Sequence, residues 1–366
     1  MTIRTALIGF GWSSQHIWLP RLQAAADYEV VAAVDPHPGR RSRFTATTGR
    51  PAIPSLEEFD PDRVDFAIVA LPNYLHARVG CGLLERGVAT FIEKPVCLST
   101  TEADFLAAAE NCGGVSLLAG SAARHRADIA EFRALLPQLG ELRTVDLSWL
   151  RASGVPGGGG WFTNRGLAGG GVLIDLGWHL LDVFEDIAGP ATFRQVTAMT
   201  SHDHVNTPSK GTTWRGGQES LGAVAVADVE DTVRAFMVTD SGVGVGLVAS
   251  WASAAVTHDS TSIRVTGSAG TATLRCTFGF SPNRERRPGI TVVSDRRIQE
   301  IVVPTEPPGT EYDRLLDEIR DRLADPRARG TAIRGARRII DTIEAIYAAA
   351  GEPTALTESA AMEDVG

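Results

Sequence analysis

Two residues able to move a proton stand four positions apart in this chain. Asp175 and His179 lie in an apolar stretch that follows three glycines at residues 169–171. If the stretch is helical, both side chains project from one face, because residues four apart are neighbours on a helix. An imidazole titrates near physiological pH and can accept a hydroxyl proton. A nearby carboxylate can orient the imidazole or take part in the proton transfer. A hydrogen-bonded structural pair on a helix would show the same spacing.

A lysine elsewhere in the chain could assist such a proton transfer. Lys94 follows Glu93 and a short apolar run at residues 89–92, which predicts a buried strand. A lysine at a strand end is costly to bury without a purpose. Its ammonium group can hydrogen-bond the oxygen at a reacting carbon and stabilise a developing alkoxide. Lys94 therefore shifts the interpretation of Asp175 and His179 from a structural pair towards a catalytic group.

Residues 1–35 predict a dinucleotide site. A strand at residues 5–8 precedes a glycine turn, and a second strand at residues 30–34 ends in Asp35. Glycines let the backbone approach a pyrophosphate, whose charge is met by the amide groups of the following helix. The Asp35 carboxylate can accept hydrogen bonds from ribose hydroxyls and repels a 2′-phosphate, so NAD is favoured over NADP. The turn residues are Gly9, Phe10, Gly11, Trp12, Ser13 and Ser14, with Ser14 where Gly or Ala is usual.

The composition is that of a globular protein acting on small molecules. The chain has 366 residues, of which 43% are hydrophobic and 22% charged, and a formal net charge of −9. This length predicts two domains. The acidic balance, without a long basic run, argues against a nucleic-acid or membrane-surface partner.

Metal chemistry and export are not expected. The four cysteines show no C-x-x-C spacing, which excludes a zinc ribbon and a redox pair. The segment His202-Asp203-His204 could hold a metal, but no further ligands stand at a suitable spacing, so we expect no metal. No signal-peptide pattern precedes the first strand, and no uninterrupted apolar segment is long enough to span a bilayer. We therefore expect a cytoplasmic protein.

Strand and helix patterns alternate up to about residue 120. We expect strands at residues 64–70, 89–92 and 115–120, with helices at residues 76–86 and 101–110. This alternation predicts an α/β Rossmann domain, a doubly wound parallel sheet, at residues 1–122. Ligands bind at the carboxyl ends of the strands of such a sheet. The residues at those ends join the glycine turn as cofactor-binding candidates: Leu71, Pro72, Asn73, Glu93 and Lys94.

The pattern changes after a helix expected at residues 128–136. Longer segments with strand periodicity predict an α+β domain at residues 123–350, built on a large, mostly antiparallel open sheet. Its strands are expected at residues 142–150, 193–200, 229–239, 243–251, 262–267, 271–276, 290–294 and 298–303.

Helices complete this second domain. The longest is expected at residues 171–187, and two closing helices at residues 311–323 and 331–350 precede a poorly ordered tail at residues 351–366. A sheet face that helices leave uncovered commonly pairs with another subunit, so we expect a homodimer or homotetramer through this sheet.

In these motifs the chain resembles the glucose-fructose oxidoreductase, inositol dehydrogenase and MocA family (Gfo/Idh/MocA). The resemblance covers about residues 3–350 and rests on motifs in family order. They are Gly9-Phe10-Gly11, the segment at residues 71–76, Glu93-Lys94-Pro95, and the segment at residues 169–182. The Glu-Lys-Pro and Asp-x-x-x-His motifs together are specific.

The resemblance implies roles for individual residues. Lys94, Asp175 and His179 form the catalytic group, and the nicotinamide and its ribose lie near Pro72, Asn73, His76 and Glu93. Arg124 falls where relatives often carry a substrate arginine, although His125 follows it where an aromatic residue is common. Trp161, Asn164 and Arg165, between the glycine loop and the helix, are substrate candidates on their position alone and equally suit a structural loop.

The implied activity is NAD-dependent hydride transfer to or from a secondary hydroxyl of a sugar, aminosugar or cyclitol such as inositol. His179 would remove the hydroxyl proton, while Lys94 and Asp175 position and polarise that oxygen. Two other functions remain open. One is a redox-neutral epimerase or glycosidase with tightly bound NAD, and the other is a non-catalytic NAD-sensing protein.

Overall fold

The chain forms two compact units in a computed structural model. The structure describes all residues except 1, 121, 158–159, 208–210, 212–225 and 354–366. Unit 1 comprises Met1–Ala130 with Pro304–Arg337, and unit 2 comprises Glu131–Val303 with Arg338–Gly366. Both units are therefore discontinuous in sequence. The division at residue 122 expected from the sequence stays a prediction.

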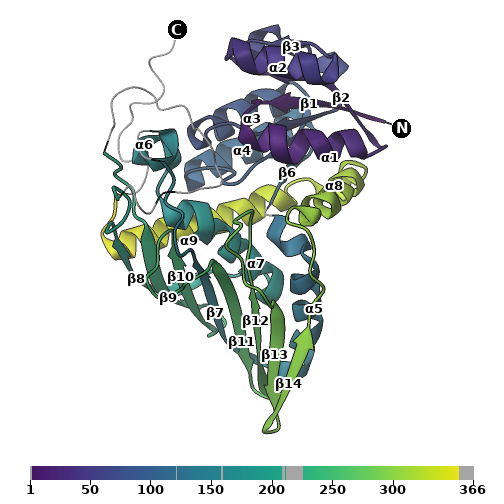
Figure 1. Ribbon diagram of the computed structural model, residues 1–366. Coiled ribbons are helices and arrows are strands. Elements are labelled where there is room, and N and C mark those ends of the chain that lie inside the picture. Colours follow the sequence, from purple (N-terminus) through teal and green to yellow (C-terminus); the bar gives the residue numbers. More distant parts are fainter. Residues whose placement is uncertain (1, 121, 158–159, 208–210, 212–225, 354–366) are drawn as a thin grey trace. The chain divides into compact units, whose positions relative to one another are not determined.

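Unit 1 is built on a parallel sheet of six strands. The strand order is β3-β2-β1-β4-β5-β6, with the chain crossing back past β1 between β3 and β4 (Figure 1). This order confirms the doubly wound sheet. The strands are β1 Ile3–Ile8, β2 Tyr28–Val34, β3 Ala52–Ile53, β4 Phe66–Val69, β5 Ala89–Ile92 and β6 Leu117–Ala119.

Buried apolar residues explain these strands. Every residue of β4 and β5 is buried, as expected for strands that helices cover on both faces. The helices are α1 Leu19–Ala24, α2 Pro38–Thr48, α3 His76–Glu85, α4 Thr100–Gly113 and α8 Thr310–Leu323. Two more, α5 Ala127–Leu135 and α9 Thr331–Ala350, contribute residues to both units.

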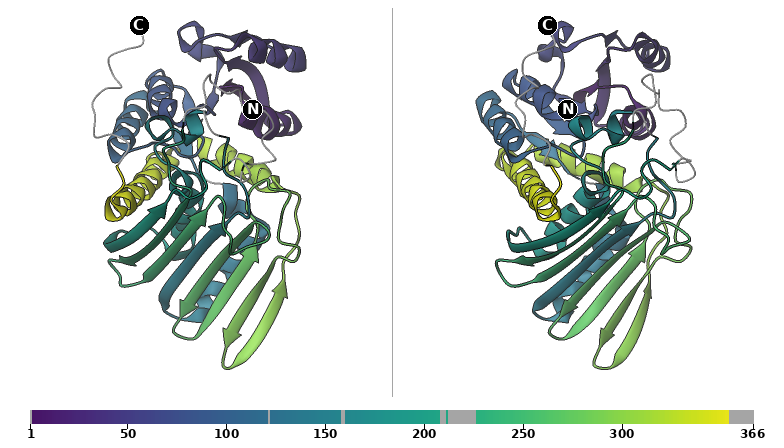
Figure 2. Two further views of the ribbon diagram at one scale, coloured as in Figure 1. Left: turned by 60° about the vertical axis from the view of Figure 1, so that its left-hand side comes forward. Right: turned by 90° about the vertical axis from the view of Figure 1, so that its left-hand side faces the viewer.

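Unit 2 is built on an open sheet of eight strands, which Figure 2 shows side by side. The order is β14-β13-β12-β11-β7-β10-β9-β8, and only β7 and β10 pair in parallel, so the mostly antiparallel sheet is confirmed. The strands are β7 Leu142–Leu150, β8 Phe193–Ser201, β9 Thr232–Thr239, β10 Gly244–Ser250, β11 Ser260–Gly267, β12 Gly270–Cys276, β13 Gly289–Ser294 and β14 Arg297–Val302.

The two faces of this sheet differ in exposure. Strands alternate buried and exposed residues, as in β9, where Val233, Ala235 and Met237 are buried. The long helix α7, Trp178–Ala188, packs against β7 (Figure 1). Phe236 on the other face is 57% exposed. An exposed apolar side chain such as Phe236 is consistent with the predicted subunit contact on this face.

The long helix of unit 2 differs from its predicted form. Instead of one α-helix over residues 171–187, a π-helical turn at Leu173–Gly177 precedes α7. The segment Arg165–Ala188 also has the length and apolarity of a membrane span, which the sequence interpretation had not found. Of its most apolar window, 89% is buried inside the structure, as in the core helix of a folded domain.

Candidate functional site

The glycine turn of unit 1 is shaped for a close backbone approach. Gly9 follows β1 with φ +90°, and a Cβ there would lie 2.6 Å from the Ala70 carbonyl oxygen, so only glycine fits. A Cβ on Gly11 would meet no described atom within 4 Å, which leaves room for a ligand. Ser14 is fully buried, and its Oγ donates to the Gly9 carbonyl over 2.5 Å. Ser14, which stands where Gly or Ala is usual, is thus small enough for this position and also stabilises the turn through its hydrogen bond.

Asp35, at the end of β2, is joined to that turn. Its Oδ2 accepts the Phe10 N–H over 2.8 Å, and its Oδ1 accepts the His37 N–H over 2.8 Å. The Arg40 guanidinium lies 3.6 Å from the same carboxylate, because α2 begins at Pro38 and turns Arg40 back towards it. A cation beside Asp35 weakens the electrostatic case for NAD over NADP.

Glu93 links the end of β5 to the helix after the glycine turn. Its Oε1 accepts the Trp18 indole N–H over 2.8 Å and the Ser13 hydroxyl over 3.3 Å. Burial raises the pKa of the Glu93 carboxyl above its usual range, against the lowering effect of the Trp18 hydrogen bond and the Lys94 charge. Glu93 therefore fixes the Lys94 backbone beside the glycine turn.

His76 connects two of the predicted cofactor-binding segments. Its ring nitrogens lie 2.6 Å from the Pro95 carbonyl oxygen and 2.9 Å from the Leu71 carbonyl oxygen, and the side chain is fully buried. Burial also lowers the pKa of His76. Both ring nitrogens are thus engaged by main-chain carbonyls, so His76 shapes the chain around residues 71–73 and 93–95. Pro72 and the buried Asn73 lie in the first of these segments.

In unit 2, Asp175 is held by a hydrogen bond and an ion pair. It lies in the π-helical turn, and its Oδ2 accepts the Trp251 indole N–H over 3.0 Å. The Arg151 guanidinium lies 3.8 Å from the same oxygen. Asp175 is 6% exposed, so these contacts rather than water fix the orientation of its carboxylate. Such π-helical turns are frequent at functional sites.

His179 follows Asp175 in the first turn of α7 and lies against an aromatic wall. Its ring centroid is 5.6 Å from that of Trp149, and the Phe278 ring packs edge-on against Trp149 at 5.4 Å between centroids. The Arg151 guanidinium lies over the Trp149 ring at 5.5 Å. The buried Trp149 indole N–H has no hydrogen-bond partner among the residues that the structure describes. His179 itself is only partly buried.

The sequence interpretation missed Trp149, Arg151 and Trp251. Strands β7 and β10 run in parallel, with Trp149 opposite Ala249, so all three residues lie at the same carboxyl edge. The available signal was a bulky or charged residue at the end of each strand. That signal becomes specific only when the two strands are known to pair.

The three substrate candidates before the helix have contacts within unit 2. Asn164 caps α6, Arg165–Ala168, by accepting the Leu167 N–H over 3.2 Å. Arg165 is buried and bonds the carboxylates of Glu230 and Glu352 over 3.3 and 2.9 Å. These bonds favour the structural role, and the substrate role of Arg165 stays a prediction. Trp161 packs against Phe162 at 5.0 Å between ring centroids. In unit 1, the partly buried Arg124 lies in a 3-10 turn at Ala122–His125.

The described residues contain no group of three or more metal-ligating side chains. His202 instead contacts the Val229 carbonyl over 3.0 Å and the Glu352 carboxylate over 2.8 Å. The Asp231 carboxylate accepts the backbone N–H of His204. The expectation of no metal stays a prediction.

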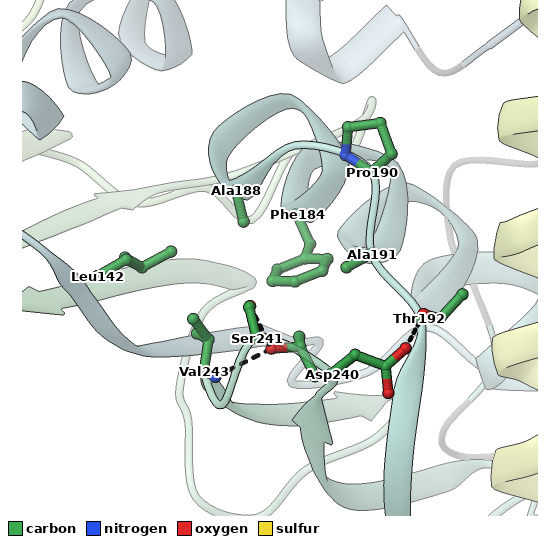
Figure 3. Close-up of a pocket in the computed structure, with 10 residues that line it drawn as sticks. Leu142, Phe184, Ala188, Pro190, Ala191, Thr192, Asp240, Ser241 and Val243 are labelled. Atoms are coloured by element: carbon green, nitrogen blue, oxygen red, sulfur yellow. Dashed lines mark hydrogen bonds between the residues drawn. The ribbon is translucent and has the colours of Figure 1, made fainter.

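A cavity of about 200 Å³ lies at the opposite end of α7 from Asp175 (Figure 3). Phe184 contributes to its apolar lining, and Thr192 donates a hydrogen bond to Asp240, another lining residue. None of the site residues predicted from the sequence lines it. The lining residues are Leu142, Phe184, Ala188, Pro190, Ala191, Thr192, Thr239, Asp240, Ser241 and Val243.

Comparison with known families matches most of the chain to one family. Residues 3–121 match the model of the Gfo/Idh/MocA oxidoreductase family with its NAD-binding Rossmann fold, and residues 136–273 match the Gfo/Idh/MocA C-terminal domain. The chain belongs to the Gfo/Idh/MocA family. The resemblance that the motifs indicated is therefore confirmed, as is the two-part fold that it implied.

Individual family members are similar over different shares of the chain. A protein of Amycolatopsis mediterranei (strain S699), named "putative UDP-kanosamine synthase oxidoreductase subunit", is 52% identical over 351 residues, or 96% of this chain and 97% of that protein. D-glucoside 3-dehydrogenase of Escherichia coli (strain K12) is 29% identical over 203 residues, or 54% of this chain and 57% of that protein.

A solved family member has the same fold. KijD10, a 3-ketoreductase from Actinomadura kijaniata in complex with NADP and TDP-benzene, superposes with a TM-score of 0.75. It is 19% identical, and the match covers 95% of this chain and 98% of KijD10. KijD10 was solved with NADP, whereas the family description names NAD. The comparisons therefore do not decide between NAD and NADP for this chain.

Proposed function

We propose that this Gfo/Idh/MocA protein oxidises the C3 hydroxyl of a UDP-hexose, with UDP-glucose as the first candidate substrate. The observation that carries this proposal is the 52% identity to the UDP-kanosamine synthase subunit over nearly the full length of both chains. Kanosamine is 3-amino-3-deoxyglucose, so its C3 must be a ketone before an amine can replace the oxygen. The D-glucoside 3-dehydrogenase name is consistent with chemistry at the same carbon.

The residues of unit 1 fit a bound dinucleotide. Gly9 lets the turn pass close to Ala70, and Gly11 leaves space beside its backbone for a pyrophosphate. Asp35 follows the end of β2, where a ribose is recognised. The nicotinamide, when bound, takes up or returns the hydride of the sugar carbon. We propose NAD as the cofactor, on the strength of the acid at position 35.

The protein side chains handle the proton and the oxygen. We propose that His179 accepts the proton of the C3 hydroxyl, while the C3 hydrogen leaves as a hydride, with both electrons of its bond. Asp175, fixed by Trp251 and Arg151, orients the reacting groups. Lys94 donates a hydrogen bond to the oxygen as it becomes a carbonyl, which stabilises negative charge in the transition state.

An assay with UDP-glucose tests this proposal. Purified protein, UDP-glucose and NAD should give NADH absorbance and a sugar nucleotide that is two hydrogens lighter by mass spectrometry. Because the keto sugar accumulates poorly if the equilibrium favours the alcohol, a carbonyl trap such as hydroxylamine should increase the yield. No NADH and no trapped ketone, from UDP-glucose or other UDP-hexoses, would exclude the proposal.

The same assay separates the alternatives. A redox-neutral epimerase or glycosidase would change the sugar without net NADH, and an NAD-sensing protein would bind NAD without changing any sugar. We retain the redox-neutral reaction as the second candidate because the same Lys94, Asp175 and His179 would serve it. We also propose a cytoplasmic location, where NAD and nucleotide sugars are both present.

A further inference from the structure

One buried carboxylate organises the start of the segment that carries Asp175 and His179. Glu230 is fully buried, and its carboxylate accepts the N–H groups of Gly171 and Leu173, each over 3.0 Å. Its own carbonyl oxygen accepts the N–H of Val172 over 3.0 Å. Glu230 alone therefore satisfies three consecutive backbone donors.

These donors are the ones that a helix leaves unpaired at its start. The amino end of a helix also carries partial positive charge, so a carboxylate stabilises it. Burial raises the pKa of the Glu230 carboxyl, because a charge is costly to place away from water. Tyr347 Oη at 2.8 Å and Arg165 at 3.3 Å offset that cost with further hydrogen bonds to the carboxylate.

The approach of Glu230 depends on glycine. A Cβ on Gly171 would lie 2.0 Å from the Glu230 carbonyl oxygen, and a Cβ on Gly170 would lie 1.9 Å from Tyr347 Oη. Gly170 also has φ +153°, a conformation that favours glycine. The glycines before the helix thus let Glu230 and Tyr347 approach its backbone.

The next residue of the chain reaches the same site from another side. The Asp231 carbonyl oxygen accepts the backbone N–H of Trp251 over 2.9 Å. The indole N–H of Trp251 donates in turn to Asp175. Two adjacent residues therefore hold both the start of the helical segment and the side chain that orients Asp175.

We propose that Glu230 is a positioning residue for hydride transfer, acting through the Gly171–Leu173 backbone to place Asp175 and His179. The carboxylate touches neither sugar nor cofactor in this role. The inference rests on the proposed oxidation for its kinetic test, while a second test needs no substrate.

Glu110 provides a matched control. It is also a buried carboxylate, 2% exposed, that accepts two backbone N–H groups, those of Leu117 at 2.8 Å and Gly330 at 3.0 Å. It lies in unit 1 and contacts none of the predicted site residues in these bonds. Glu110→Gln therefore removes a comparable buried charge without altering the segment that carries Asp175.

The kinetic test compares Glu230→Gln with Glu110→Gln. We expect Glu230→Gln to lower kcat about 10- to 100-fold, the equivalent of one charged hydrogen bond, with KM and the Kd of NAD changed less than about threefold. Glu230→Asp, which keeps the charge, should recover part of kcat. Equal losses of kcat in Glu230→Gln and Glu110→Gln, or a change confined to KM, would overturn the proposal.

The second test measures hydrogen exchange of the full-length protein without substrate. In Glu230→Gln, the amides of residues 169–180 should exchange at least about tenfold faster than in the wild type, and in Glu110→Gln they should not. Unchanged exchange in Glu230→Gln would overturn the role of Glu230 even if the kinetic effect appeared. A wild type that oxidises no sugar overturns the proposed function, and the exchange result then still decides whether Glu230 holds this segment.

Discussion

The indole N–H of Trp251 donates a 3.0 Å hydrogen bond to Oδ2 of Asp175, joining the end of β10 to the π-helical turn before α7. Both side chains are buried, so water competes little for this bond. It explains how a short carboxylate on a helical turn keeps one orientation, which proton transfer requires.

Removing this donor should slow turnover. Trp251→Phe keeps most of the ring but loses the N–H, and we expect kcat to fall about 10- to 100-fold, as for other hydrogen bonds to charged groups. Steady-state kinetics with UDP-glucose measure the effect. Tyr28→Phe is the control, because it removes a buried 2.6 Å hydrogen bond to the Leu316 carbonyl in unit 1. Comparable losses in both variants would assign the Trp251 effect to general stability.

Lys94→Met should separate cofactor binding from chemistry. We expect the variant to bind NAD with little change but to lose at least about three orders of magnitude in kcat, since it removes the group that stabilises the developing oxyanion. Isothermal titration with NAD and single-turnover kinetics report the two quantities. Near-normal turnover would remove Lys94 from the chemistry.

Asp35 should set the cofactor preference. Asp35→Ser removes the carboxylate that repels a 2′-phosphate. Arg40, which lies 3.6 Å from that carboxylate in the wild type, then remains to attract the 2′-phosphate. We expect the Kd of NAD to rise about tenfold and the Kd of NADP to fall. Adding Arg40→Ala should reverse the gain for NADP. An unchanged ratio of the two Kd values in Asp35→Ser would show that Asp35 does not select the cofactor.

The contact between His202 and Glu352 should make stability depend on pH. Burial lowers the pKa of His202, but the Glu352 carboxylate and the Val229 carbonyl outweigh it, so the pKa is raised overall. The folded protein thus holds this proton more tightly than the unfolded chain does. The stabilisation is complete below the ordinary histidine pKa of about 6.5 and is lost as the pH rises through the raised value.

Melting temperatures of His202→Gln test this direction of pH dependence. The variant should melt below the wild type at about pH 6, and the difference in melting temperature (the gap) should close at higher pH. Thr200→Val removes a 2.5 Å hydrogen bond to the same carboxylate without removing a titrating group, so its gap should stay constant over this range. A His202→Gln gap that grows with pH would contradict the assigned direction.

The open face of the unit 2 sheet should carry the proposed subunit contact. Phe236→Arg places a charge on this face and should convert a dimer or tetramer into smaller species in sedimentation velocity. Phe105→Arg is the matched control, because Phe105 is 60% exposed on α4 of unit 1. A wild-type monomer, or an unchanged oligomer in Phe236→Arg, would exclude this face.

Much of the fold follows from local sequence patterns. The predicted strands at residues 89–92 and 142–150 and the predicted helix at residues 331–350 match β5, β7 and α9 at both ends. Their apolar spacing and flanking turn residues encode these elements locally. The glycine turn and Asp35 follow from the same patterns, since they stand at strand ends.

The rest of the site depends on pairing between distant segments. Trp149 and Trp251 share one edge only because β7 pairs with β10 in parallel, and Glu230 meets Gly171 only because the chain before β9 returns to the helix. No local periodicity encodes these contacts. The placement of Arg40 beside Asp35 is more local, but it requires knowing where α2 begins.

Transfer of a labelled hydrogen tests the proposed function most directly. UDP-glucose that carries deuterium at C3 is incubated with NAD and the wild-type protein, and the cofactor is then analysed by mass spectrometry. We expect deuterated NADH from the wild type and none from Lys94→Met or His179→Ala. Unlabelled NADH would contradict hydride transfer from C3, and a changed sugar without any reduced cofactor would contradict net oxidation.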